Sequence, residues 1–88
     1  MKHRDIVVSN SLGIHARPAA LIVKTAMKFN AAIHLVKDGT KADAKSIMSI
    51  MILAAAQNTK ISIQASGSDE EPAVNAIAEL FEKKFNEE

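Results

Sequence analysis

The dipeptide Asp38-Gly39 separates two short segments whose residues are typical of β-strands. Residues 32–37 place the apolar side chains of Ile33 and Leu35 on one side, and residues 40–44 are long enough for a short return strand. Asp-Gly favours a two-residue hairpin turn, because both turn positions need positive φ and this pair tolerates it. The sequence therefore predicts a β-hairpin, which requires at least one antiparallel pair of strands.

Five further segments have the character of strands or helices. Residues 3–8 contain the β-branched run Ile6-Val7-Val8 and residues 60–66 alternate apolar with polar side chains, so both are predicted strands. Three helices are also predicted. The first runs from Pro18 to about Asn30, and the second runs from an N-cap at Ser46 to about Ala55. The buried side of the third is formed by Val74, Ile77, Leu80 or Phe81, and Phe85.

The start of the third helix can be read in two ways. Ser68 and Glu71 have the spacing of a capping box. Pro72 instead favours Asp69 as the N-cap, because the proline then lies among the first three helical positions, whose N–H groups have no helical acceptor.

The predicted element order is strand, helix, strand, strand, helix, strand, helix. This order predicts the α+β class, with a sheet covered by helices on one face in two layers. The sequence contains no repeat and no linker, so residues 1–88 are expected to form one domain.

Composition excludes several classes of function. Eleven basic and ten acidic residues leave a net charge of +1, and the only aromatic residues are three phenylalanines, which argues against a nucleic-acid partner. There are no cysteines, so thiol chemistry and zinc–thiolate sites are excluded. No apolar run reaches the length of about 18 residues that predicts a membrane span, and the N-terminus lacks a secretory signal. We therefore expect a cytoplasmic protein that needs no cofactor.

The segment Gly13-Ile14-His15-Ala16-Arg17-Pro18 carries the most chemical information. The first N–H groups of a helix point outward and carry partial positive charge, so Ala16 and Pro18 mark a site that favours an anion. Arg17 adds a planar guanidinium whose donors match phosphoryl oxygens. The imidazole of His15 is a nucleophile near neutral pH, so the segment is a candidate phosphoryl-acceptor site.

Local physics leaves another interpretation open, because a histidine before a helix is often a surface residue or a local hydrogen-bonding group. His3 lies near the N-terminus and His34 lies within a predicted strand, on its solvent side. The three histidines have no spacing with carboxylates that would suggest a metal site, so none is predicted.

Two motifs resemble the HPr family, the phosphocarriers of the bacterial phosphoenolpyruvate-dependent phosphotransferase system. Residues 13–19 are similar to the family's active-centre motif, and residues 45–51, Lys-Ser-Ile-Met-Ser-Ile-Met, are similar to its regulatory serine region. Gly67 and the acidic run 69–71 before the last helix also match, so the resemblance covers nearly the whole chain.

The resemblance implies both a function and a fold. His15 would be phosphorylated on Nδ1 by phosphorylated enzyme I and would pass the group to IIA proteins or domains, with Arg17 pairing with the phosphoryl group and Pro18 shaping the helix start. Such a protein is a stoichiometric carrier and not a turnover enzyme. The implied fold is an open-faced sandwich, with an antiparallel four-stranded sheet in the order 1-4-2-3 and three helices on one side.

Ser46 and the helix after it are predicted to serve regulation and docking. The resemblance implies that an HPr kinase/phosphorylase phosphorylates Ser46 and that, in some bacteria, a transcriptional regulator binds this form. The helix is apolar on nearly every face, so Ile47, Met48 and Met51 are expected to be partly exposed and to contact partners. A basic rim for acidic partners is expected from Lys24, Lys28 and Lys45.

Two alternatives remain beside a sugar-transport carrier. Leu12 stands where many sugar-pathway members carry a small polar residue, and residues 10–13 look closer to the nitrogen-related branch, which regulates without transporting. The region around Ser46 looks instead like the sugar branch. A non-catalytic docking module is the other alternative, although docking alone requires neither His15 nor Arg17. A monomer is expected, because a carrier must present the same loop to successive partners.

Overall fold

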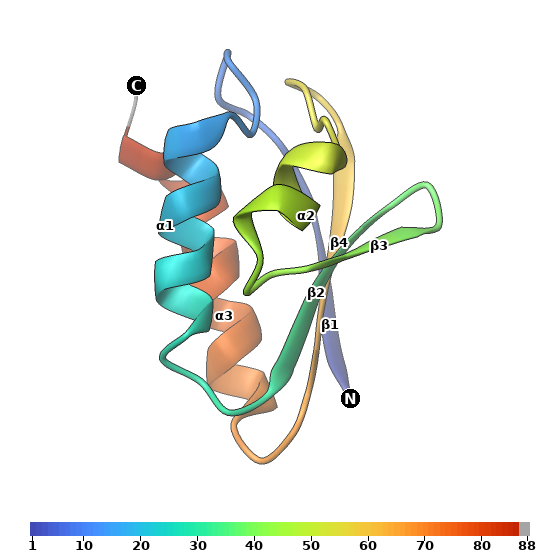
Figure 1. Cartoon of the computed structure of the whole chain (residues 1–88), viewed down its shortest axis with the longest axis vertical. Coiled ribbons are helices and arrows are strands. Elements are labelled where there is room, and N and C mark those ends of the chain that lie inside the picture. Colours follow the sequence, from blue (N-terminus) through green and yellow to red (C-terminus); the bar gives the residue numbers. More distant parts are fainter. Residues whose placement is uncertain (87–88) are drawn as a thin grey trace.

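The structure is a computed structural model, and it describes residues 1–86 (Figure 1). Its elements follow one another in the predicted order. The strands are β1 (Lys2–Val7), β2 (Ala32–Lys37), β3 (Thr40–Asp43) and β4 (Lys60–Ser66), and the helices are α1 (Ala16–Ala26), α2 (Ile47–Ile52) and α3 (Glu70–Glu82), with a 3₁₀ turn at Lys84–Asn86. Within these residues, no helix combines the length and apolar character that crossing a membrane requires.

The four strands form an antiparallel sheet in the order β1-β4-β2-β3. In the register of β2 with β4, Ile33 lies opposite Ala65 and Leu35 lies opposite Ile63. At the β2–β3 hairpin, Asp38 and Gly39 have φ values of 49° and 81°, so the turn has the positive φ that Asp-Gly predicts. The predicted α+β class, the hairpin and the strand order 1-4-2-3 are confirmed.

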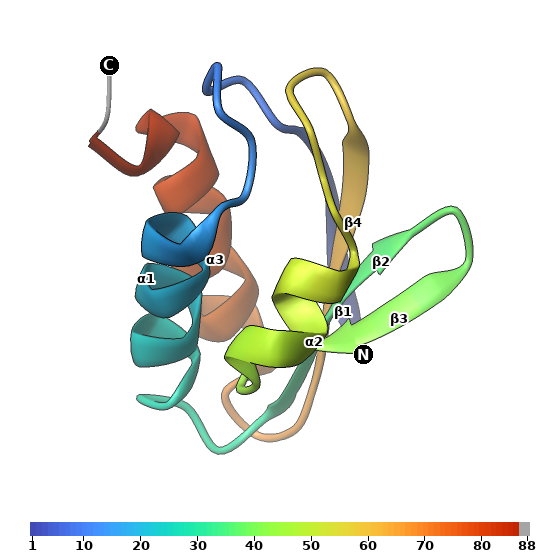
Figure 2. The ribbon, with the colours of Figure 1, turned by 45° about the horizontal axis from the view of Figure 1, so that its top comes forward.

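The core lies between the sheet and the three helices, which all cover the same face of the sheet (Figures 1 and 2). The alternation of β4 turns Ile61 and Ile63 toward this core, where both are fully buried. Ile22 of α1 and Ile77 of α3 are fully buried against them in the same apolar cluster. Burying one such side chain contributes about 1.5–3 kcal/mol. The opposite face of the sheet carries Ser62 and Gln64 of β4, with Val7 of β1 and Val36 of β2 on the same side.

The prediction for the first helix was wrong at both ends. Helix α1 begins at Ala16, so Pro18 is its third residue and His15 is its N-cap. A proline is tolerated there for the reason that applies to Pro72, because the N–H groups of the first turn have no helical acceptor. At the other end the helix stops at Ala26, before the predicted Asn30. The histidine is consequently closer to the helix start than the sequence indicated.

The second helix is shorter than predicted. Ser46 is its N-cap, as predicted, and its hydroxyl accepts a hydrogen bond from the Ser49 N–H at 3.3 Å. The helix ends at Ile52 and not near Ala55, because Ala54 adopts the left-handed region with φ of 51°. The ammonium group of Lys37 donates to the carbonyl of Leu53 at 2.8 Å and so satisfies the end of the helix.

The third helix has Asp69 at its N-cap, as Pro72 predicts, but the side chain of Asp69 does not cap the helix. Its carboxylate instead accepts hydrogen bonds from the N–H groups of Asn30 and Ala31, both at 2.8 Å. The capping box of Ser68 with Glu71 is wrong, since the side chain that reaches back belongs to Glu70, which accepts from the Gly67 N–H at 3.1 Å. Asp69 therefore ties the start of α3 to the segment between α1 and β2.

Phe85 is buried as predicted, but it lies beyond the helix that was expected to carry it. Helix α3 ends at Glu82, and Phe85 belongs to the 3₁₀ turn that follows. Its ring packs edge-on against the ring of Phe81, with centroids 4.9 Å apart, and Phe85 is fully buried. The last turn of the described chain is thus held to the core by an aromatic pair.

The two amide contacts of Asp69 predict a pH-dependent stability. The hydrogen bond from the Asn30 N–H, and then the one from Ala31, lower the pKa of the Asp69 carboxyl below its ordinary value of about 3.9 although partial burial opposes them. A lowered folded-state pKa means that the ionised group stabilises the fold above the unfolded value and that this stability is lost as the pH falls through the folded value. Urea unfolding of Asp69→Asn should therefore show a lower midpoint than wild type at neutral pH, with the difference shrinking at a pH below the ordinary value of a carboxyl group. An equal gap at both pH values would contradict this.

Candidate functional site

His15 lies where the loop after β1 becomes helix α1. Its backbone is extended, with φ of −96° and ψ of −167°, and its carbonyl accepts the first helical hydrogen bond, from the Ala19 N–H at 3.0 Å. The side chain is half-buried and makes no capping hydrogen bond to the helix. The ring therefore does not cap the helix, as most N-cap side chains do, and the residue is partly open to solvent.

The start of α1 provides an electropositive environment beside His15. The N–H groups of Ala16 and Arg17 precede the first helical hydrogen bond, and Pro18 contributes no N–H. The first turn contains no acidic residue that would cancel the helix dipole. Ala16 is exposed and Pro18 is buried, so the amides that can reach an anion here belong to Ala16 and Arg17.

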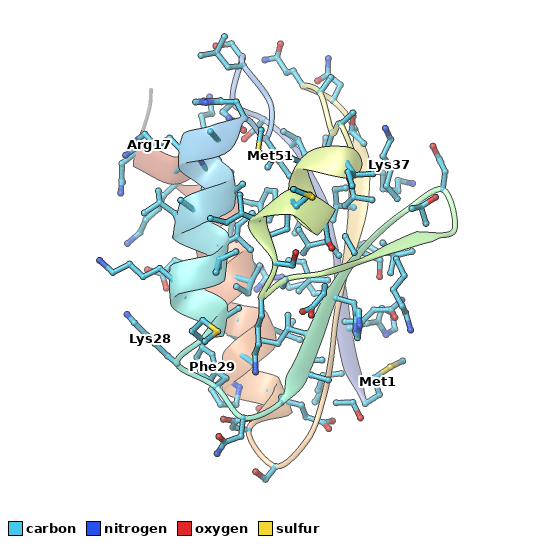
Figure 3. The ribbon with its side chains drawn as sticks, viewed as in Figure 1. Met1, Arg17, Lys28, Phe29, Lys37 and Met51 are labelled. Carbon is cyan, nitrogen blue, oxygen red and sulfur yellow. The ribbon has the colours of Figure 1, made fainter. Side chains whose placement is uncertain are left out.

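Arg17 points toward the end of the described chain. Its Nη1 donates a hydrogen bond to the carbonyl of Phe85 at 2.8 Å, and Figure 3 shows the side chain at one end of the molecule's longest axis. The carbonyl belongs to an unusual turn, because Lys84, Phe85 and Asn86 all have positive φ, between 51° and 60°. The guanidinium has five N–H donors, and this bond uses one of them.

The loop that carries His15 is braced from both sides. The side-chain amide of Asn10 donates to the Gly13 carbonyl at 2.7 Å, and the Gly13 N–H donates to the Asn10 carbonyl at 3.1 Å. The N–H of the buried Ile14 then donates to the carbonyl of Ala55 at 2.9 Å. Asn10 and Gly13 have composition signals for a loop, but nothing in the sequence points to Ala55 as their support. The loop before His15 is thus fixed to the segment that follows α2.

Gly13 allows this close contact. Its φ is +68°, and a Cβ atom at this position would lie 2.5 Å from the Ala55 carbonyl oxygen and 2.9 Å from the Cα of Ala56. These atoms belong to the backbone, so they cannot move aside as a flexible side chain would. The position requires glycine for both its φ and its space.

One face of α2 is apolar and exposed, as predicted. Its residues are Ile47, Met48, Met51 and Ile52, which are 44, 73, 44 and 71% exposed, and they line a shallow depression of about 610 Å³. We call this surface the α2 face. Sequence reasoning noted that Ile52 is apolar but did not assign it to a surface, although its place one turn after Met48 would have indicated this. Helix α2 packs against α1, and the segment after it supports the His15 loop.

The lysines predicted to form a basic rim differ in their surroundings. Lys24 is exposed on α1, and Lys28 is exposed in the turn after that helix, toward the opposite end of the molecule from Arg17 (Figure 3). Lys45 is half-buried, and its ammonium donates to the carbonyl of Phe29 at 2.9 Å. Lys45 therefore ties the start of α2 to the segment that follows α1, a structural role that the prediction did not include.

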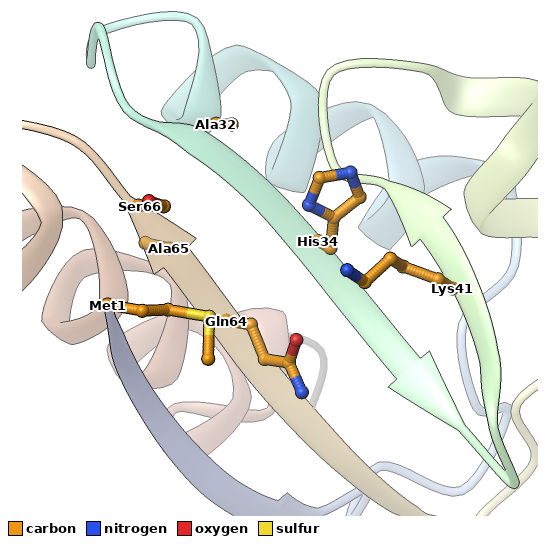
Figure 4. Close-up of a pocket in the computed structure, with 7 residues that line it drawn as sticks. All are labelled: Met1, Ala32, His34, Lys41, Gln64, Ala65 and Ser66. Atoms are coloured by element: carbon orange, nitrogen blue, oxygen red, sulfur yellow. The ribbon is translucent and has the colours of Figure 1, made fainter.

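The other two histidines lie outside this site. In the register of the sheet, His3 and His34 lie on either side of Gln64, which points away from the helices. His34 is half-buried and lines a pocket of about 110 Å³ with Lys41 on the open face of the sheet (Figure 4). Among residues 1–86, no group of three or more potential ligands could hold a metal ion.

Comparisons with known proteins agree with this arrangement. Residues 2–83 match the family described as the PTS HPr component phosphorylation site. The chain is 44% identical over 88 residues to the phosphocarrier protein HPr of Xylella fastidiosa (strain 9a5c), covering 100% of this chain and 99% of that protein. It superposes on a crystal structure of HPr-C-His from Thermoanaerobacter tengcongensis with a TM-score of 0.96 and 49% identity, covering 100% and 99% of the two chains.

A structure of an HPr dimer from the same organism matches with a TM-score of 0.77 and 48% identity, covering 97% of this chain and 98% of that one. The family match spans nearly the whole sequence, and the curated relative and the solved structures agree with it. The chain therefore belongs to the HPr family, the phosphocarriers of the phosphotransferase system.

Proposed function

We propose that His15 accepts a phosphoryl group on Nδ1 from phosphorylated enzyme I and passes it to IIA proteins or domains of the sugar phosphotransferase system. The observation that carries this proposal is the position of His15, a partly exposed N-cap directly ahead of the Ala16 and Arg17 amides. A neutral imidazole there can attack phosphorus while the helix start stabilises the negative charge of the transferred group.

The transfer exchanges one P–N bond for another. The lone pair of His15 Nδ1 attacks the phosphorus of the donor phosphohistidine, and the bond from phosphorus to the donor's ring nitrogen breaks. The reverse sequence delivers the group to the next protein, so the carrier ends each cycle unchanged. Positioning and charge stabilisation, with no cofactor, are sufficient for such a reaction.

Incubation with phosphoenolpyruvate and enzyme I tests the proposal. Intact-mass measurement should show the gain of one phosphoryl group, which is lost in acid, and NMR of the labelled imidazoles should place it on Nδ1 of His15. Peptide mapping should find His3 and His34 unmodified. If no cognate donor produced the acid-labile adduct, the docking-module alternative would be left.

Replacing Arg17 by alanine should slow phosphoryl transfer and leave the fold intact. We propose that the guanidinium exchanges its bond with the Phe85 carbonyl for a phosphoryl oxygen during transfer. A charge-assisted hydrogen bond contributes about 1.5–3 kcal/mol, so the rate should fall about 10- to 100-fold. Rapid-quench transfer from enzyme I measures this rate. The matched control is Arg4→Ala, which removes an exposed arginine of β1 that pairs with Glu82 of α3, and it should not change the rate. A rate for Arg17→Ala equal to wild type would reject the proposed role.

We also propose that phosphorylation of Ser46 regulates docking at the α2 face. Ser46 already caps α2, and a phosphate or carboxylate at that position would place negative charge directly before Ile47 and Met48. Ser46→Asp should therefore weaken enzyme I binding about tenfold, because the apolar surface must desolvate beside the charge. Ser46→Asn is the matched control, since asparagine caps helices as well as aspartate does but is neutral. Equal affinities of the two variants in calorimetry would count against the docking assignment.

Several finer statements remain part of the proposal. The sugar branch is favoured by the residues around Ser46, and a reconstituted sugar-transfer assay separates it from the nitrogen branch. The expected monomer stays a prediction, which sedimentation can test, since a relative has been solved as an HPr dimer. The cytoplasmic location, the single domain over residues 1–88 and the transcriptional-regulator partner also stay predictions.

A further inference from the structure

The methionines of this chain have an uneven distribution. All four are exposed, with Met1 at 74%, Met27 at 64%, Met48 at 73% and Met51 at 44%. The buried apolar residues of the described chain are Ile, Leu, Val, Ala and Phe, without a methionine among them. Because the sequence has no cysteine, these four thioethers are its only sulfur atoms. Every sulfur that an oxidant could modify is therefore at the surface.

Two of the four methionines lie on the α2 face. Met48 and Met51 share this surface with Ile47 and Ile52, and they supply its only sulfur atoms. In Figure 3, Met51 lies toward the same end of the molecule as Arg17, whereas Met1 lies toward the other end. Two methionines therefore belong to the α2 face, and Met1 and Met27 lie outside the residues that define it.

We propose that Met48, together with Met51, is an oxidation site through which peroxide reversibly switches off docking at the α2 face. For its effect on transfer, this inference rests on the proposed function. The thioether sulfur attacks one oxygen of hydrogen peroxide, the O–O bond breaks, and a sulfoxide and one water molecule form. The sulfur loses two electrons and the peroxide gains them. Methionine sulfoxide reductases, using thiol reductants, reverse the step.

The surroundings of Met48 predict a change in binding without a change in fold. Sulfoxidation makes a flexible apolar side chain polar, and a polar group buried in an interface without a partner weakens binding. On the free protein the sulfoxide of Met48 stays in water, since the side chain is 73% exposed. The core contains no methionine sulfur to be damaged, so the stability of the fold should be preserved.

Peptide mapping after graded hydrogen peroxide treatment tests the site itself. Met48 should gain one oxygen at least as fast as Met27, since their exposed fractions are similar, and Met51 should follow more slowly. The thermal midpoint of the oxidised protein should equal that of the untreated protein. If Met48 resisted oxidation in the folded protein while Met27 was oxidised, the inference would be overturned, whatever the outcome for phosphoryl transfer.

Two variants test the effect on docking. Met27→Leu keeps the methionines of the α2 face, and the double variant Met48→Leu with Met51→Leu removes them but keeps Met27. Each is treated with peroxide, desalted, and compared with its own untreated sample in phosphoryl transfer from enzyme I at limiting concentration. Oxidation should slow Met27→Leu about tenfold or more, because one unsatisfied polar group at an interface has an effect of that size. The double variant should keep its own untreated rate.

The untreated samples separate this inference from the proposed function. If untreated wild-type protein accepts no phosphoryl group, the proposed function fails, and with it the regulatory part of the inference. If the untreated protein transfers normally and oxidised Met27→Leu transfers equally fast, only the inference is overturned. Recovery of the rate after treatment with methionine sulfoxide reductase supports the switch, and failure to recover contradicts its reversibility.

Discussion

Replacement of His15 by alanine is expected to abolish phosphoryl acceptance and to leave stability almost unchanged. The proposed Nδ1 nucleophile is lost, and no other group at the start of α1 can form a P–N bond. The imidazole makes no capping hydrogen bond to the helix and is only half-buried. Its removal takes away no side-chain cap of α1, so the free energy of unfolding should change by no more than about 1 kcal/mol. Intact-mass measurement after incubation with phosphoenolpyruvate and enzyme I, together with urea unfolding, checks both statements.

The matched control for this experiment is His34→Ala. This histidine is also half-buried, but it lies on the open face of the sheet beside Lys41 and not at a helix start (Figure 4). The His34 variant should gain one phosphoryl group at the wild-type rate. An adduct that persisted in His15→Ala and disappeared in His34→Ala would move the acceptor site to the sheet and refute the assignment made here.

The strands could be predicted from the sequence more accurately than the helices. The alternation of apolar and polar side chains at residues 60–66 predicted both ends of β4 correctly, because the strand ends where the alternation ends. The helix ends depend on other parts of the chain. Helix α2 ends where Ala54 turns left-handed and Lys37 of β2 reaches the Leu53 carbonyl, and neither event leaves a local signal.

In the candidate site, too, some parts could be predicted from the sequence and others could not. His15, Arg17 and Ser46 could be identified because their side chains have distinctive chemistry and a motif around them. Their supports could not, because these are backbone carbonyls contributed by distant segments. The Phe85 carbonyl that binds Arg17 is 68 residues away in the sequence, and any residue type could supply it. For the same reason, the role of Ala55 under the His15 loop becomes visible only in three dimensions.

Gly13→Ala should have the second large effect, a loss of both stability and transfer rate, because it disturbs the contact of the His15 loop with Ala55. The new Cβ would lie 2.5 Å from the Ala55 carbonyl oxygen, so the loop and the segment after α2 must separate. Left-handed φ at a non-glycine residue costs about 1–2 kcal/mol, and overpacking against backbone adds about 1–3 kcal/mol. The free energy of unfolding should therefore fall by about 2–5 kcal/mol in total. Urea unfolding at constant m-value measures the change.

Gly39→Ala separates the two contributions to that loss. Gly39 also has positive φ, at 81°, but a Cβ there meets nothing within 4 Å. This variant should lose only the conformational part, about 1–2 kcal/mol, and should transfer phosphoryl groups at the wild-type rate. Gly13→Ala should in addition transfer more slowly, by about tenfold or more, because a shift of about 1 Å in a reacting group has an effect of this order. If both variants lost the same stability and neither lost rate, the contact with Ala55 would not be what positions His15.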